Sequence, residues 1–304
     1  MTDAQLTAIL GAARKRFWQG RAVKLALVII VGVGVLADIG LAELVWPGQS
    51  QTIGLWVLMG ALGIWMLLSM TSAANVRLIG AAGAYTGAQQ FDLAERTLMT
   101  AATNFSLYQS ISLLAIYNLA VLAHGQGRFA QAAWLCGFLQ EFPSRSADPM
   151  GRRSLMILAE SELMLGQLPL AYQHLSALRG RPLSQPEQLA LLPTTCYYEV
   201  CVNRWDYLVQ TARARVELAR LLPAPQSAVS LACLAMGFQQ MGYLPQRDWL
   251  WQQATLLLDR QTLIDRFPQL AALPGDRVMK LPWPSESDAG GANLNHGMSP
   301  GVIV

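Results

Sequence analysis

The sequence predicts an all-α protein in which a two-helix transmembrane hairpin precedes a stack of helix pairs. Two long apolar runs, residues 25–46 and 53–71, stand near the start of the chain and are separated by a short polar turn. The remaining sequence shows helical periodicity punctuated by proline, without the alternation typical of strands. Charged residues make up 13% of the chain, about half the share of a typical soluble domain, which argues against a purely soluble protein.

The hairpin, residues 25–72, is predicted from the lengths of the two apolar runs. The second run has 19 residues without a charge, enough to cross a hydrocarbon core of roughly 30 Å. The first run carries Asp38 and Glu43 in its second half, and Asp38 is interpreted either as a boundary carboxylate or as a functional group inside the membrane. Two alternatives stay open: a helix pair buried in a soluble core, and a signal peptide cleaved after Ala37.

Residues 1–24 form a basic, amphipathic segment that predicts the orientation of the hairpin. Five cations precede the first span and the turn between the spans has none; they are Arg14, Lys15, Arg16, Arg21 and Lys24. The positive-inside rule therefore places the N-terminus, and after two crossings also the remaining chain, on the cytoplasmic side of a bacterial-type inner membrane. Apolar residues at helical spacing further predict a helix in the lipid headgroups; they are Leu6, Ile9, Leu10, Ala13 and Phe17.

An internal repeat follows, with intervals of 38, 39, 37 and 39 residues between large anchor residues at Phe91, Phe129, Leu168, Trp205 and Leu244. Nine residues before each anchor stands a small side chain: Ala82, Ala120, Ala159, Cys196 and Ala235. Two residues before each anchor stand Gln89, Gly127, Gly166, Asn203 and Gly242. Where this residue is Gly or Asn, it is expected to supply the left-handed backbone that ends the first helix. Three residues after it stand Ala94, Ala132 and Ala171, then Leu208 and Arg247.

This pattern predicts five helical hairpins within a repeat domain at residues 75–272. Small residues let two helices approach closely, and proline marks the boundaries between pairs. The expected pairs cover residues 75–104, 108–142, 150–180, 186–222 and 226–260, with a short cap at 261–272. Residues 273–304, rich in Gly, Pro, Ser and Asn, are expected to form a flexible tail.

The repeat resembles the tetratricopeptide repeat (TPR). The resemblance is clearest around Leu119-Ala120, Gly127-Arg128-Phe129, Ala132 and Pro143, and it weakens in the last two units, where Leu208 and Arg247 replace the small residue. It implies a TPR-like α-solenoid of about five helix pairs whose inner face binds a protein or peptide. The inner-face spacing then gives a partner-binding groove of Tyr117, Asn118, Val121, Met156, Glu160, Tyr197, Met236 and Gln239.

No motif for chemistry accompanies these features, so we expect no enzyme, cofactor or metal. The histidines, His124, His174 and His296, are far apart, and the four cysteines form no metal-binding spacing. A net charge of +3 is too small to indicate nucleic-acid binding.

The sequence thus predicts a membrane-anchored TPR-like adaptor or scaffold, held in the bilayer by residues 25–72, that binds a protein partner on the cytoplasmic face. The alternative is a structural subunit of a membrane transport or secretion complex that assembles through its hairpin. A homo-oligomer is compatible with either hypothesis, since glycines in both spans permit close helix contact.

Overall fold

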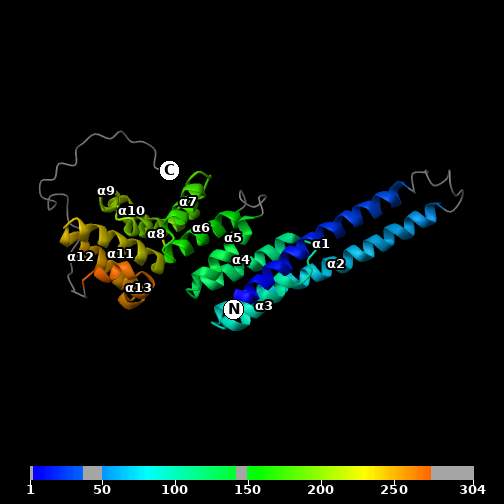
Figure 1. The fold of residues 1–304 in the computed structure, drawn as a ribbon, viewed down its shortest axis with the longest axis horizontal. Helices are drawn as coiled ribbons and strands as arrows, with labels where there is room; N and C mark the ends of the chain where they lie inside the picture. The colour runs from blue at the N-terminus through cyan, green and yellow to red at the C-terminus, as the bar shows by residue number, and fades with distance from the viewer. Residues whose placement is uncertain (1–2, 37–49, 142–148, 275–304) are drawn as a thin grey trace. The chain divides into compact units, whose positions relative to one another are not determined.

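The computed structural model describes residues 3–36, 50–141 and 149–274 (Figure 1). These residues are helical apart from short turns, and no strand occurs among them, so the prediction of an all-α protein is confirmed for this part of the chain. Asp38, Glu43, residues 47–49 of the predicted turn and most of the predicted tail lie outside the described residues. Residues 50–52, also predicted as turn, are helical.

The first two helices are longer than the predicted segments. Helix α1, Asp3–Leu36, joins the basic segment to the first apolar run without a break at residue 24. Helix α2, Ser50–Gly87, likewise continues from the second apolar run into the first helix of the repeats, without a break at residues 72–75. Because neither predicted limit coincides with a helix end, no flexible linker separates the apolar helices from the repeats.

The remaining helices follow one another with short connections. They are α3 (Phe91–Thr103), α4 (Gln109–Gly125), α5 (Phe129–Gln140), α6 (Pro149–Met164), α7 (Leu168–Arg179), α8 (Gln185–Cys201), α9 (Trp205–Gln210), α10 (Ala212–Ala219), α11 (Ala224–Gln240), α12 (Leu244–Leu257), α13 (Arg260–Arg266) and the 3-10 helix η3 (Pro268–Ala272). Each of the five anchor residues is the first residue of a helix. The fourth helix pair differs from the others because its second helix is divided into α9 and α10 at Thr211.

Each anchor is preceded by the same three-residue turn. The residue two positions before it has a positive φ, and these five are the positive-φ residues of the described chain: Gln89, Gly127, Gly166, Asn203 and Gly242. The next backbone N–H bonds to the carbonyl five residues earlier, at 2.8–2.9 Å in all five turns. This is the Schellman arrangement, which ends the first helix and reverses the chain. The left-handed backbone predicted at the four Gly and Asn positions is confirmed, and Gln89 adopts it as well.

The other repeat positions are buried as their size requires. The small residues nine positions before each anchor are at most 1% exposed, so the facing helices approach closely there. Seven positions after the anchors the side chains are also buried: Leu98, Cys136, Leu175, Ala212 and Trp251. Leu208 breaks the small-residue rule and is accommodated by Gly237 of α11, where an added Cβ would lie only 3.0 Å from the Leu208 Cβ.

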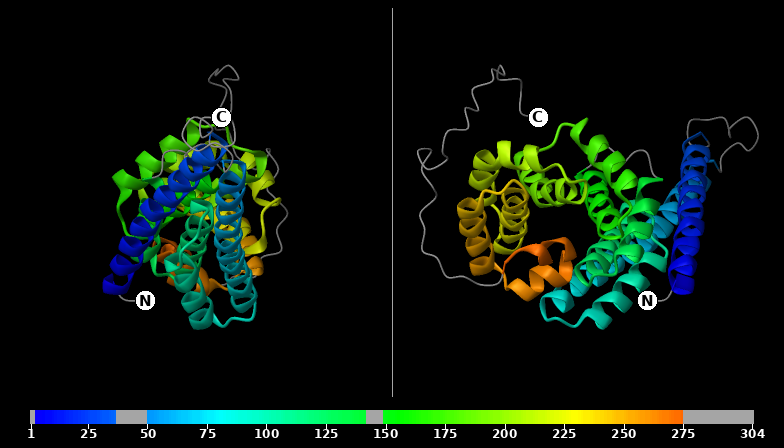
Figure 2. Two further views of the ribbon diagram at one scale, coloured as in Figure 1. Left: turned by 90° about the vertical axis from the view of Figure 1, so that its right-hand side faces the viewer. Right: turned by 60° about the vertical axis from the view of Figure 1, so that its left-hand side comes forward.

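The chain forms two compact units, Met1–Ser154 and Leu155–Val304. In the first unit, α1 contacts α2 and also α3, α4 and α5 (Figure 1). In the second, α11 packs on α12 and α8, and a continuous apolar core joins α8 through α13. The orange C-terminal segment lies beside the yellow helices of this unit in the right-hand view of Figure 2.

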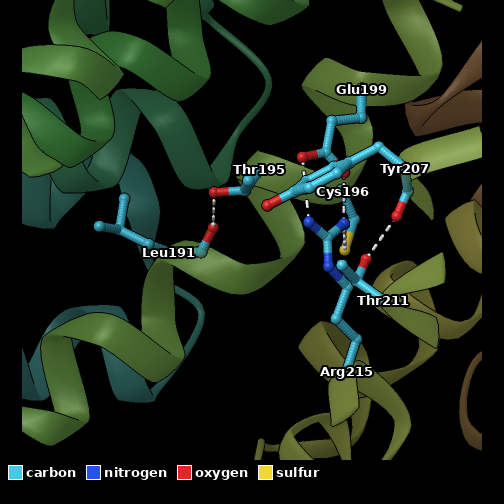
Figure 3. A network of polar contacts seen from close by, with 7 residues as sticks. All are labelled: Leu191, Thr195, Cys196, Glu199, Tyr207, Thr211 and Arg215. Atoms are coloured by element: carbon cyan, nitrogen blue, oxygen red, sulfur yellow. Dashed lines mark hydrogen bonds and ion pairs between the residues drawn. The ribbon is translucent and has the colours of Figure 1, made fainter. Parts of the chain in front are cut away.

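A buried polar network holds the divided fourth pair together (Figure 3). Arg215 of α10 donates to both carboxylate oxygens of Glu199 in α8, and the Arg215 Nη1 lies 3.5 Å from the Cys196 Sγ. The guanidinium also lies over the Tyr207 ring of α9, 5.1 Å from its centroid. Three helices therefore meet at a single cation.

Candidate functional site

The first candidate surface is the apolar surface of α1 and α2. Both helices carry large apolar side chains that are more than half exposed. They are Leu25, Val28, Ile29, Val33, Leu55, Trp56, Met59, Leu62, Met66, Leu67 and Met70. Residues Leu55–Gly87 form a stretch long and apolar enough to cross a membrane. A helix pair buried in a soluble core would hide these side chains, whereas here they are exposed. Among the described residues, Leu55–Gly87 is the one helical stretch that passes this length and hydropathy test.

The N-terminal half of α1 does not match the expectation of a helix lying in the headgroups. Its apolar stripe is buried against the first unit, with the Phe17 and Phe138 rings 6.2 Å apart and Leu6 fully covered. Arg14 forms an ion pair with Glu141, and the Lys24 Nζ lies 5.3 Å from the centroid of the Tyr108 ring. The same apolar spacing that suits lipid also suits a neighbouring helix, and here it packs on protein.

The second candidate is a cleft on the first unit, between α2 and α4 with α3 at its floor. It has a volume of about 520 Å³ and is lined by Ile79, Gly83, Phe91, Leu98, Asn118, Val121 and neighbouring residues. Two predicted groove residues, Asn118 and Val121, thus line an open cleft. Tyr117 is half-buried, and burial raises the pKa of its hydroxyl.

The remaining predicted groove residues belong to the second unit, and four of them lie where the C-terminal segment 260–274 packs. Glu160 of α6 pairs with Arg266 at 3.3 Å. The Tyr197 ring of α8 lies edge-on to Phe267 with centroids 4.7 Å apart, and its hydroxyl donates to the Gln269 side chain. Gln239 of α11 donates to the Ala272 carbonyl at 2.8 Å, and Met236 is buried in the same apolar core. Met156 is half-buried.

This segment is the feature that the sequence interpretation missed. The sequence predicts a cap after the last pair, yet the segment contacts residues of α6, α8 and α11 that the TPR resemblance assigns to the groove. One signal in the sequence was the spacing of Leu263, Phe267, Leu270 and Leu273, which gives a short helix a single apolar stripe.

The buried titratable groups have structural surroundings. Burial raises the pKa of Cys196 to about 12, so its thiol stays protonated and unreactive at neutral pH. The His174 Nδ1 lies 2.7 Å from a Glu162 carboxylate oxygen, which joins α7 to α6. Within the described ranges, no three His, Cys, Asp or Glu side chains cluster in a way that could hold a metal ion.

Comparison with known proteins adds nothing to these observations: no family model, no curated protein and no solved structure matches the chain.

Proposed function

We propose that the chain is a membrane-anchored, TPR-like adaptor. Helices α1 and α2 form a hairpin in the cytoplasmic membrane, and the inner faces of the helix pairs bind a protein or peptide partner in the cytoplasm. The observation that carries the proposal is the open cleft of about 520 Å³ at the groove positions Asn118 and Val121. The exposed apolar surface of the same unit supports membrane anchoring.

The adaptor proposal predicts that a partner contacts the cleft. A photo-crosslinking amino acid at Val121, in the cleft, should trap a protein in intact membranes. Trp134 of α5 is the matched control, because its side chain is also exposed but does not line the cleft. Equal crosslinks from both positions, or none from Val121, would contradict the adaptor.

Topology can be tested separately with a membrane-impermeant maleimide. The native cysteines give low background, because three are buried and Cys201 is half-buried. Ser50→Cys, at the start of α2, should be labelled from outside spheroplasts, and Gln173→Cys of α7 only after lysis. Labelling of Gln173→Cys in intact spheroplasts would place the repeats outside the cell.

A structural subunit that assembles through the hairpin is the second candidate. An apolar cleft of about 460 Å³ lies between α1 and α2 and is lined by residues such as Leu27, Val31, Ala61 and Leu62. Its size suits side chains of another transmembrane helix. Leu62→Trp should fill it and release a hairpin partner, whereas Met66→Trp, exposed but outside the cleft, should not.

Leu62→Trp tests assembly through the hairpin more specifically than deletion of residues 1–74 would. The first half of α1 packs on α3, α4 and α5, so the deletion would also expose the core of the first unit.

A further inference from the structure

The C-terminal segment 260–274 has the form of a bound amphipathic peptide. Helix α13 has seven residues and η3 has five, lengths that are marginal for isolated helices. One stripe is buried and the residues between are mostly exposed; the stripe consists of Leu263, Phe267, Leu270 and Leu273. The segment is joined to α12 through Leu258, whose backbone is extended. It therefore packs as an appended strip and not as half of a further helix pair.

Its contacts fall on two positions of the repeat, −8 and −5 relative to the anchor, which are three residues apart and so share one helix face. Position −8 relative to the anchor is Glu160 in the third helix pair and Tyr197 in the fourth. Glu160 contacts Arg266, and Tyr197 contacts Phe267. Position −5 of the fifth unit is Gln239, which donates to the carbonyl of Ala272. These positions form the face that TPR-like geometry assigns to a partner.

The polar contacts at this face are incomplete. The Gln239 Oε1 atom is buried and accepts no hydrogen bond, although the Nε2 atom of the same side chain is used. The Nε atom of Arg260, at the start of α13, is also buried without a hydrogen-bond partner. A buried acceptor or donor without a partner is unfavourable, so this position of the segment leaves two polar atoms for which another occupant can supply hydrogen bonds.

The same helix face is open in the first compact unit, Met1–Ser154. Position −8 is Gly83 in the first pair and Val121 in the second, and both residues line the cleft of about 520 Å³. In the second compact unit this face of the repeat is covered by residues 260–274. In the first compact unit no described segment covers it.

We propose that residues 260–274 are an internal peptide ligand, which occupies a partner site on α6, α8 and α11 and mimics the partner that displaces it. The partner is an amphipathic protein segment with leucine, an aromatic residue four positions later, two further leucines at three-residue steps, and arginine before the aromatic residue. The apolar stripe supplies affinity, and Arg266 opposite Glu160 fixes the register. This inference rests on the proposed adaptor function.

The test uses the full chain in lipid nanodiscs and a fluorescent synthetic peptide of residues 259–274. In the variant Leu263→Ala/Phe267→Ala the internal segment loses two of its four buried apolar side chains. The peptide should bind this variant at least tenfold more tightly than the unaltered chain. An Arg266→Glu peptide should bind several-fold more weakly, and Glu160→Arg in the chain should reverse that preference. Absence of peptide binding to the folded variant would overturn the proposal.

Hydrogen exchange of the unaltered chain gives a readout that does not depend on the variant's folding. Amides of residues 263–273 should exchange through a local opening that leaves α8 and α11 protected. Exchange of the segment together with α11 would mean that it is a fixed part of the core, which contradicts the proposal.

Failure of the adaptor function has a different signature. If the peptide binds but Val121 traps no protein, the face serves only the internal segment and the partner class is wrong. If Val121 traps a protein but the peptide does not bind, the adaptor stands and the internal-ligand proposal falls.

Discussion

Arg215 of α10 and Glu199 of α8 form a two-point ion pair that is shielded from water, with the Nη2–Oε1 distance at 3.0 Å. Burial alone would lower the pKa of Arg215, but the hydrogen bonds and charge of Glu199, with Cys196 and Tyr207, raise the pKa above its ordinary value. The pair stands where the second helix of the fourth unit is divided at Thr211. The ion pair therefore helps to hold together a second helix that is interrupted in this helix pair but continuous in the other four.

Arg215→Met should destabilise the chain strongly, because it leaves the Glu199 carboxylate buried without its cation. Breaking a buried pair in this way costs about 3–5 kcal/mol. The double variant Glu199→Leu/Arg215→Met should recover most of that loss, since both charges are gone. Denaturant unfolding in micelles measures both values.

Arg220→Met is the control for this prediction. Arg220 pairs with Glu217 on the same helical stretch, but both side chains are more than half exposed. An exposed pair contributes about 0–1 kcal/mol, so a loss equal to that of Arg215→Met would show that the fourth unit is sensitive to any change of charge.

The five turns provide a second prediction, because glycine is used in three of them and a side chain in two. Ala in place of Gly127, Gly166 or Gly242 should cost about 1–2 kcal/mol, since φ is +74° to +80° and the left-handed region disfavours a Cβ. Gln89→Gly should stabilise the chain by roughly 1 kcal/mol for the same reason. Thermal unfolding measures each change.

The control is Gly180→Ala at the end of α7. Its φ is −74° and an added Cβ would meet its nearest neighbours at 3.8 Å, an ordinary contact. A large loss at Gly180 would show that glycine matters at helix ends for a reason other than the left-handed backbone.

These turns show how far the sequence could predict the structure. Spacing predicted the position of the turns and the left-handed backbone at their four Gly and Asn residues, because both depend on local backbone geometry, whereas Gln89 was not predicted to be left-handed. The position of residues 260–274 could not be predicted, since an amphipathic stripe specifies an apolar surface but not which one. The same ambiguity applies to the N-terminal half of α1, whose stripe meets Phe138 of α5 and not lipid.

The large Leu208 of the fourth helix pair is compensated by the small Gly237 of the fifth, and the spacing of residues in the sequence could not reveal this. Gly237→Ala should destabilise the chain by about 1–3 kcal/mol, because the new Cβ would crowd the Leu208 Cβ at 3.0 Å. Adding Leu208→Gly removes the Leu208 Cβ, which alanine would keep, and should relieve that crowding. A double-mutant cycle should therefore give a coupling energy of at least 0.5 kcal/mol. Additive effects of the two substitutions would refute direct contact as the cause.

Glu95 of α3 predicts a pH dependence. Burial raises its pKa, but hydrogen bonds and charge, with those of Arg128 as the largest, together lower it to below the ordinary 4.5. A lowered folded-state pKa stabilises the chain above the unfolded-state value, and that stability is lost as the pH falls through the folded-state pKa. Arg128→Met should therefore lower the free energy of unfolding at neutral pH and make its decline below about pH 5 shallower. Arg96→Met, an exposed cation on α3, should leave the slope unchanged.

The apolar surface of α2 gives the last prediction. Leu62→Arg/Met66→Arg places two charges on side chains that are 60% and 65% exposed in a segment apolar enough to span a bilayer. Each arginine near the centre of a span costs about 2.5–3.5 kcal/mol of insertion free energy, so the double variant should be extracted from membranes by alkaline carbonate. Leu256→Arg/Leu257→Arg is the matched control, because both leucines of α12 are also exposed but lie outside α1 and α2. Equal extraction of both variants, or retention of the first, would mean that another feature holds the protein at the membrane.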